Sequence, residues 1–176
     1  MSTYISGGCK NGKSHYALKA AKAHEGPYYY VATMIPRDEE DRARVLAHRR
    51  EREGWGFVTL ECARNLPECL EGADPRGAFL IDSVTALLSN EMFPNDGFNG
   101  NAAVEVATQL ETFVRRAPNT VLVSDFIFSD AALYDETTEH YRRGLAFIDR
   151  HMARFCDNVI EVINAQCVVH KGRLPV

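Results

Sequence analysis

The chain has 176 residues, 45% of them hydrophobic and 25% charged, which fits one globular domain spanning 1–176 with a sizeable core rather than two small domains. Its formal net charge of -4 does not favour bulk nucleic-acid binding, because such binding needs a basic surface. The sequence contains no apolar run of about 18 residues and does not open on a basic segment followed by a long apolar one. We therefore expect no membrane span, no secretion and a cytoplasmic protein.

Cysteine usage points to the same compartment. The chain has five cysteines, an odd number, and no two of them have the C-x-x-C spacing of a zinc or redox motif. These features argue for a reducing compartment and against a disulfide framework or a zinc site. We expect buried or surface thiols at Cys9, Cys62, Cys69, Cys156 and Cys167.

The first predicted elements are a strand, a loop and a helix within residues 3–24. An apolar run breaks into Gly-x-x-x-x-Gly-Lys-Ser, and a helical pattern with small residues follows over 14–24. In this context backbone N–H groups and the helix N-terminus bind phosphate, Lys13 neutralises the terminal phosphates, and Ser14 can ligate Mg²⁺. The alternative is a glycine-rich turn after a first strand. We expect a nucleoside triphosphate to bind at Gly7, Gly8, Cys9, Lys10, Asn11, Gly12, Lys13 and Ser14.

The middle of the chain alternates strands and helices. Residues 28–32 are aromatic and β-branched and predict a strand, and a charged helix follows over 38–52 with its acids first and its arginines last. The next predicted elements, in chain order, are a strand at 57–60, a short helix at 66–71, an apolar strand at 78–82, a helix at 85–92 and a turn-rich, mobile loop at 94–100.

The last third predicts two long amphipathic helices around an apolar strand at 120–124, and then a closing hairpin of 159–163 with 167–169. Continuous apolar strands alternating with helices indicate an α/β fold whose largely parallel sheet is covered on both faces. In the helix over 102–116 we place on the buried face Val104, Ala107, Leu110 and Val114. In the helix over 138–156 the apolar residues at helical spacing are Tyr141, Leu145, Ile148, Met152 and Phe155.

Ligands of open α/β sheets bind beyond the carboxyl ends of the strands, and Asp82 is the clearest candidate at such an end. Four apolar residues precede this acid, on a strand that could neighbour the strand of the phosphate loop. The arrangement matches a Walker B acid that holds Mg²⁺ directly or through water. The alternative is that Asp82 caps the helix that starts near Thr85.

The helix over 38–52 carries Arg44, His48 and Arg52 at i, i+4 and i+8, on one face. Neighbouring guanidinium charges would disfavour the imidazolium form and leave His48 neutral and nucleophilic, while the arginines hold phosphate oxygens. This pattern suits a covalent phosphohistidine-type intermediate. The alternative is that the acids and arginines only complement the helix dipole and that the histidine is solvated.

The order of these signals resembles the adenosylcobinamide kinase/adenosylcobinamide-phosphate guanylyltransferase family over nearly the whole chain. The phosphate loop alone is shared by many NTPases, whereas the succession of Ala-Thr, Arg-x-x-x-His and Trp-x-x-x-Thr-x-Glu that follows it is specific. The segments that carry the resemblance are Gly7-Gly8-x-x-x-Gly12-Lys13-Ser14, Tyr30-Val-Ala-Thr33, Ala43-Arg-Val-x-x-His48-Arg49, Trp55 with Thr59-x-Glu61-Cys62, Leu80-Ile-Asp82-Ser83-x-Thr85 and Val121-Leu-Val-Ser124.

The resemblance implies a three-layer, RecA-like P-loop NTPase fold with a mostly parallel central sheet and a C-terminal hairpin. It implies an enzyme that phosphorylates the aminopropanol hydroxyl of adenosylcobinamide, with GTP or ATP and Mg²⁺, and then transfers GMP from GTP to that phosphate through guanylylated His48. It also implies a homotrimer. Beyond the loop, the implied nucleotide-site residues are Ala32, Thr33, Met34, Arg49, Arg50, Glu51, Arg52, Glu61 and Asp82, with Ser14 and Asp82 at the metal.

One region departs from the family. Where the family has Asn-Glu-x-Gly after the strand at 120–124, this chain has Asp125-Phe126-Ile-Phe128 and an apolar segment to Glu136, and Asp149 replaces an expected Asn. We expect Asp125 to repel phosphates unless Mg²⁺ or an arginine compensates its charge. The rings of Phe126 and Phe128 could fill the pocket or stack on a large planar ligand; the alternative is that these residues only pack a loop while the acceptor binds elsewhere. Guanylyl transfer would then be more robust than cobinamide phosphorylation. The alternatives are a family member that keeps only one activity or uses a changed acceptor, and a non-catalytic GTP-binding protein.

Overall fold

A seven-stranded sheet in the order β3-β2-β4-β5-β1-β6-β7 runs through the protein. In the computed structural model, which describes residues 1–95 and 97–175, all strand pairs are parallel except β6 with β7. The elements are β1 Thr3–Ser6, α1 Lys13–Lys22, β2 Tyr28–Ala32, α2 Glu39–Glu51, β3 Phe57–Glu61, η1 (a 3₁₀ helix) Leu66–Leu70, β4 Ala78–Asp82, α3 Val84–Met92, α4 Ala102–Arg116, β5 Thr120–Val123, α5 Glu136–Phe155, β6 Asn158–Ile163 and β7 Gln166–Lys171.

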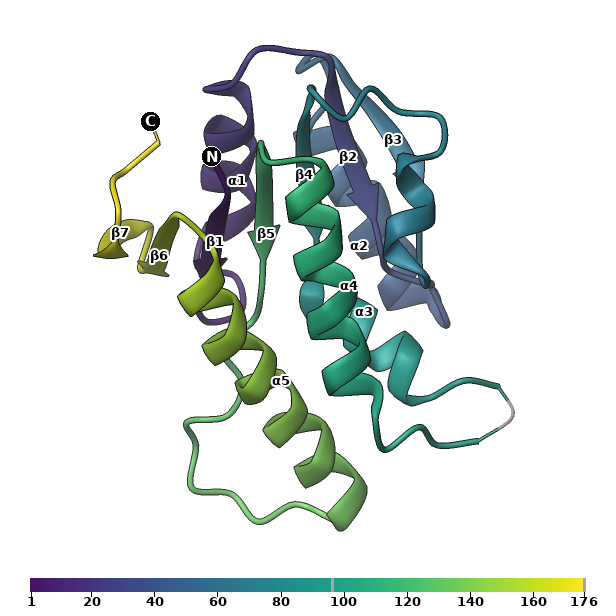
Figure 1. Ribbon diagram of the computed structural model, residues 1–176. Coiled ribbons are helices and arrows are strands. Elements are labelled where there is room, and N and C mark those ends of the chain that lie inside the picture. The colour runs from purple at the N-terminus through teal and green to yellow at the C-terminus, as the bar shows by residue number, and fades with distance from the viewer. Residues whose placement is uncertain (96, 176) are drawn as a thin grey trace.

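Helices cover both faces of the sheet and make three layers (Figure 1). Helices α3, α4 and α5 pack on one face, where Tyr4, Phe79 and Ile81 point. Helix α1 packs on the other, where Ile5 and Leu80 point. Successive residues of a strand face opposite sides, so the continuous apolar runs supply both cores at once. The predicted α/β fold with a mostly parallel sheet and a closing hairpin is confirmed.

The strand order corrects one expectation about Asp82. Strand β5 lies between β1 and β4, since Val123 is in register with both Ile5 and Asp82. The strand that carries Asp82 therefore does not neighbour the strand of the phosphate loop. One interposed strand between these two is the RecA-like arrangement of a P-loop fold.

The predicted buried face of α4 is confirmed at Ala107, Leu110 and Val114 but wrong at Val104, which is 58% exposed; Val106 and Phe113 are buried instead. At 3.6 residues per turn, each step of three residues falls about 60° short of a full turn. Two such steps separate Val104 from Leu110, so the helix turns Val104 about 120° away from the core. The predicted face of α5 is confirmed at its centre, where Leu145, Ile148 and Met152 are buried.

The cysteines also depart from expectation, because Cys62 and Cys69 form a disulfide. The turn of η1 folds the intervening segment back and brings their Cα atoms to 6.2 Å, within the range that a disulfide spans. Spacing along the chain did not indicate this pair. The expected thiols are found at Cys9, Cys156 and Cys167. Within residues 1–95 and 97–175, none of the helices combines the length and the apolar character that crossing a membrane requires.

Candidate nucleotide site

The carboxyl ends of β1, β2, β4 and β5 meet at one edge of the sheet, the lower edge in Figure 1. A cavity of about 670 Å³ opens there between the loop after β1 and helix α2. Its lining comprises Cys9, Lys10, Asn11, Gly12, Lys13, Ser14, His15, Tyr30, Ala32, Met34, Pro36, Arg44, Val45, Ala47, His48, Arg49, Glu51, Arg52, Glu61, Asp82, Ser83, Val123 and Asp125.

The loop after β1 is built on two glycines for different reasons. A Cβ at Gly7 would lie 2.3 Å from the carbonyl oxygen of Val162 in β6, so only glycine allows the two backbones to approach this closely. Gly12 has φ +86° and precedes α1, and no side chain caps that helix. Its first N–H groups are therefore available to an anion, which is the condition for phosphate binding at a helix N-terminus.

Lys13 is buried and points into the loop. Its Nζ donates to the carbonyl oxygen of Gly8 at 2.6 Å and lies 2.8 Å from Oδ1 of Asp125. Asp125 follows β5, where its backbone N–H donates to the hydroxyl of Thr85. The negative charge that the departure from the family introduces is therefore compensated by the loop lysine, and not by an arginine.

Asp82 ends β4 inside the same cavity. Its Oδ2 accepts a hydrogen bond from the Tyr30 hydroxyl at 2.9 Å. Burial raises the pKa of this carboxyl, and the nearby His48 opposes the rise. The cap of α3 is Ser83, whose hydroxyl accepts from the N–H of Ala86. The alternative role of Asp82 as a helix cap is thereby removed.

A metal at this place would have oxygen donors. Ser14 and Asp82 line one cavity, and hydroxyl and carboxylate oxygens suit Mg²⁺. Across residues 1–95 and 97–175 no group of three or more His, Cys, Asp and Glu side chains could hold a metal ion. Mg²⁺ is usually held in proteins by one or two carboxylates together with substrate phosphates, and Ser14 and Asp82 would fit such a site.

Helix α2 carries His48 to the cavity although none of its residues is buried. The half-buried imidazole has its Nδ1 3.4 Å from Oε2 of Glu51 and 4.0 Å from Oδ2 of Asp82. Arg44 instead lies within 4.0 Å of two acids one turn earlier, Glu40 and Asp41.

The prediction that guanidinium groups flank His48 is therefore wrong about its nearest charged neighbours, which are carboxylates. The three basic residues do line the same cavity. The guanidinium of Arg52 contacts other groups, because it lies 3.6 Å from the centre of the Tyr30 ring and donates to the Thr59 hydroxyl.

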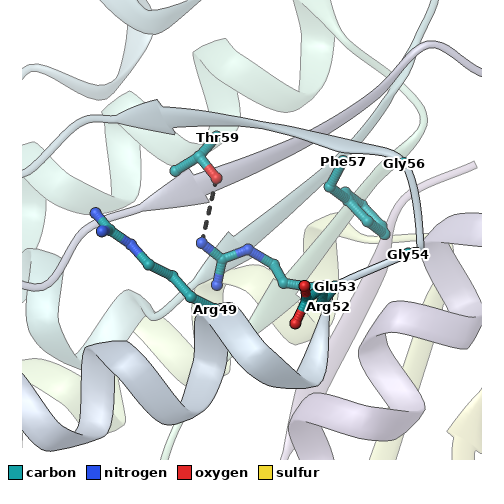
Figure 2. A pocket seen from close by; sticks show the side chains of 7 residues that line it. All are labelled: Arg49, Arg52, Glu53, Gly54, Gly56, Phe57 and Thr59. Atoms are coloured by element: carbon teal, nitrogen blue, oxygen red, sulfur yellow. Dashed lines mark hydrogen bonds between the residues drawn. The ribbon is translucent and has the colours of Figure 1, made fainter.

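A second hollow, of about 530 Å³, lies beside the first on the far side of Arg49 and Arg52. Figure 2 shows both arginines extending from the end of α2 toward β3, with Arg52 hydrogen-bonded to Thr59. Arg49 is also 3.2 Å from Glu61. These polar contacts to β3 fasten the C-terminal end of α2.

Four expected site residues do not line the main cavity. Thr33 is fully buried, and its hydroxyl donates to the carbonyl of Ser83 and accepts from its N–H, so it ties β2 to the start of α3. Arg50 is exposed on another side of α2. Gly7 and Gly8 form the backbone beneath the loop.

Several cavity residues escaped the sequence reasoning. Tyr30 could have been found, because it shares a strand face with Ala32 at the period of two. His15 follows the loop motif directly and packs edge-on against Trp55, with ring centroids 6.0 Å apart. Val45, Ser83 and Val123 also line the cavity and could have been found, because they stand in segments that carry the family resemblance. No signal in the sequence pointed to Pro36 and Ala47.

Comparisons with known proteins show the family of this chain. A family model described as cobinamide kinase/cobinamide phosphate guanyltransferase matches residues 3–169. No curated protein matches the chain. Among solved structures, a prototypical ATPase from the type III secretion system of pathogenic bacteria is 16% identical, with a TM-score of 0.41 over 91% of this chain and 51% of that one. The chain thus spans about half the length of that ATPase.

Proposed function

The chain belongs to the cobinamide kinase/cobinamide phosphate guanyltransferase family, and from this premise we propose that it phosphorylates adenosylcobinamide and then transfers GMP from GTP to the phosphate. The observation that carries the proposal is that Lys13, His48 and Asp82 line one cavity. A protein that only bound nucleotide would need the lysine and the acid but not the histidine.

In the kinase step the loop and Lys13 hold the triphosphate of GTP or ATP, and Ser14 and Asp82 hold its Mg²⁺. Phosphoryl transfer depends mainly on positioning and on neutralising charge. The buried ammonium of Lys13 supplies such a charge at the place where the terminal phosphates bind. When nucleotide binds, the ammonium of Lys13 either leaves Asp125 and contacts phosphate oxygens, or contacts both Asp125 and the phosphates.

In the guanylyl step a ring nitrogen of His48 attacks the α-phosphorus of GTP. The bond to the β-phosphate oxygen breaks and pyrophosphate leaves. The cobinamide phosphate then attacks the same phosphorus, the P–N bond breaks, and the histidine is regenerated. Because Glu51 and Asp82 lie on the Nδ1 side, they favour the proton on Nδ1 and leave the lone pair of Nε2 for the attack.

Labelling tests the histidine. GTP labelled at the α-phosphate should leave an acid-labile, base-stable adduct on the wild-type protein, as a phosphoramidate does, and His48→Asn should abolish it. His15→Asn is the matched control, because His15 lines the same cavity and should leave the adduct intact. An acid-stable adduct, or one that persists in His48→Asn, would contradict the proposal.

A second candidate is a member with a weakened kinase step, and the contact between Asp125 and Lys13 favours it. An ion pair at 2.8 Å competes with the terminal phosphates for the same ammonium. We expect Asp125→Asn to speed cobinamide phosphorylation more than adduct formation. If the wild-type protein phosphorylates cobinamide as fast as it forms the GMP adduct, and Asp125→Asn does not change that rate, the second candidate is contradicted and the fully bifunctional enzyme is supported.

We also propose a homotrimer and a cytoplasmic location, both on the family resemblance. Sedimentation equilibrium of the purified chain tests the trimer, and fractionation of the source cells tests the location.

A further inference from the structure

We propose that the corrinoid acceptor binds on the segment between β5 and α5, against a surface formed by Phe126 and Tyr134 and called here the acceptor platform. The inference rests on the proposed function for the identity of the ligand. In Figure 1 this segment is the long loop that extends beyond the lower edge of the sheet before α5 begins.

The platform lies directly beside the phosphate loop. The backbone N–H of Phe126 donates to the carbonyl of Gly7 at 2.9 Å, and the preceding residue, Asp125, contacts Lys13. Thr85 joins the two sites, because its hydroxyl accepts from the N–H of Asp125 and its carbonyl accepts from the hydroxyl of Tyr141. A ligand on the platform therefore needs to send only a short arm across Asp125 to reach the bound phosphates.

A hollow of about 430 Å³ opens at the platform. Aromatic rings and hydroxyl groups share its wall, which suits a ligand that is mostly apolar but carries hydrogen-bonding groups. The residues that line it are Phe126, Ile127, Ser129, Asp130, Tyr134, Thr138, Tyr141 and Arg142.

The apolar side chains of the segment are divided between the core and solvent. Phe128 packs against the main core, whereas Phe126 is 40%, Tyr134 44% and Leu133 100% exposed. Packing of the segment on its own core therefore accounts for Ile127 and Phe128, but not for the exposed side chains. The exposed apolar surface is in the position where a large ligand with a flat face would cover it.

The charges in the hollow are already paired. The buried guanidinium of Arg142 lies 3.0 Å from Asp130 and 2.7 Å from Glu139, and Tyr134 covers it at 4.5 Å. A paired guanidinium has little to offer a free phosphate, so a second nucleotide is disfavoured. A corrinoid has a broad macrocycle with neutral amide arms, which can cover the rings and bond to Ser129, Asp130 and Thr138.

Direct binding of cobinamide, followed by equilibrium dialysis and its visible absorption, tests the platform without nucleotide. We expect Phe126→Ser and Tyr134→Ser each to weaken cobinamide binding by about threefold to tenfold, the loss of one aromatic contact, and Phe126→Tyr to restore it. Val104→Ser is the control, because Val104 is a comparably exposed apolar residue on α4. Unfolding midpoints of the variants show that the fold is intact.

The outcomes separate this proposal from the proposed function. Wild-type affinity for cobinamide in both serine variants, or no binding of cobinamide by the wild-type protein, overturns the platform even if the GMP adduct forms on His48. Weakened cobinamide binding in both variants supports the platform even if no adduct forms, and the guanylyl mechanism would then fall alone.

Discussion

The two walls of the main cavity are held in different ways. The phosphate loop is held by its neighbours in the sheet: β1 lies between β5 and β6, and the backbone of β6 lies against Gly7. The backbone N–H of Ala165 also donates to the carbonyl of Asn11. Helix α2, on the opposite wall of the cavity, has no buried residue and is fastened near its C-terminal end by polar contacts to β3. The comparison teaches that the packed core fixes the position of the phosphate loop, whereas a few polar contacts fix the position of His48.

The largest effect is expected on nucleotide affinity, at Lys13 on the phosphate-loop side of the cavity. Lys13→Ala removes a charge-assisted phosphate contact, worth about 2 to 4 kcal/mol, or roughly 30-fold to 1,000-fold in nucleotide affinity. Isothermal titration calorimetry with GTP and ATP measures this, and Lys19→Ala, on the exposed side of α1, is the control. Unchanged nucleotide affinity in Lys13→Ala would show that the loop after β1 does not bind the phosphates.

The unfolding free energy should also depend on pH through Asp149, a residue of α5. This carboxylate accepts from the hydroxyls of Tyr4 and Ser124, and burial raises its pKa to about 6. An acid whose pKa is raised on folding stabilises the native state fully below its unfolded pKa of about 4 and loses that stabilisation as pH rises through 6.

Asp149→Asn keeps an acceptor for both hydroxyls and does not titrate. We therefore expect it to be more stable than the wild-type protein at pH 7.5, by up to roughly 3 kcal/mol, with the difference vanishing below pH 4. Urea unfolding at the two pH values measures it. A difference that does not vary with pH would show that Asp149 is not held in an unfavourable ionised form.

A smaller loss is expected from crowding the loop. Gly7→Ala places a methyl group against the carbonyl of Val162, and overpacking of this kind costs about 1 to 3 kcal/mol of unfolding free energy. Gly72→Ala is the matched control, because a Cβ there meets nothing within 4 Å. Equal stability of the two variants would mean that β6 does not constrain the loop.

The smallest effect is expected on α2. Leu46 is 52% exposed, so Leu46→Ala should change the unfolding free energy by less than about 0.5 kcal/mol. Leu110→Ala in the fully buried face of α4 should cost about 2 to 5 kcal/mol. If Leu46→Ala lowers the unfolding free energy as much as Leu110→Ala does, α2 is packed in solution, for example against another copy of the chain. The two walls of the cavity would then not differ in packing.

Local chemistry made much of this structure predictable. The apolar runs at 28–32 and 78–82 coincide with β2 and β4, and the predicted helix at 102–116 coincides with α4. The phosphate loop was recognisable because the backbone turns and side chains that bind phosphate are all encoded within eight residues, Gly-x-x-x-x-Gly-Lys-Ser, between a strand and a helix. The alternation of such elements was enough to predict a parallel sheet with both faces covered.

The strand order and the ionic contacts between different elements of the site were missed because they depend on residues distant in sequence. The pattern at 78–82 predicts a buried strand but says nothing of its neighbours, so the placement of β5 between β1 and β4 was missed. Helical spacing placed His48 between two arginines, while the carboxylate nearest it beyond its own helix, Asp82, comes from a strand 34 positions away (82 − 48). The contact between Lys13 and Asp125 has the same origin.

The sequence by itself therefore determined the elements, the phosphate loop and the set of chemical groups available, because periodicity and backbone chemistry act within a few residues. Only the tertiary structure decided which of these groups meet. Strand order and register bring Asp82 and Asp125 to one edge, and the way α2 rests on β3 turns His48 toward carboxylates and Arg52 toward Tyr30. These contacts are set by the packing of whole elements, and no local pattern encodes the direction in which a packed element presents its side chains.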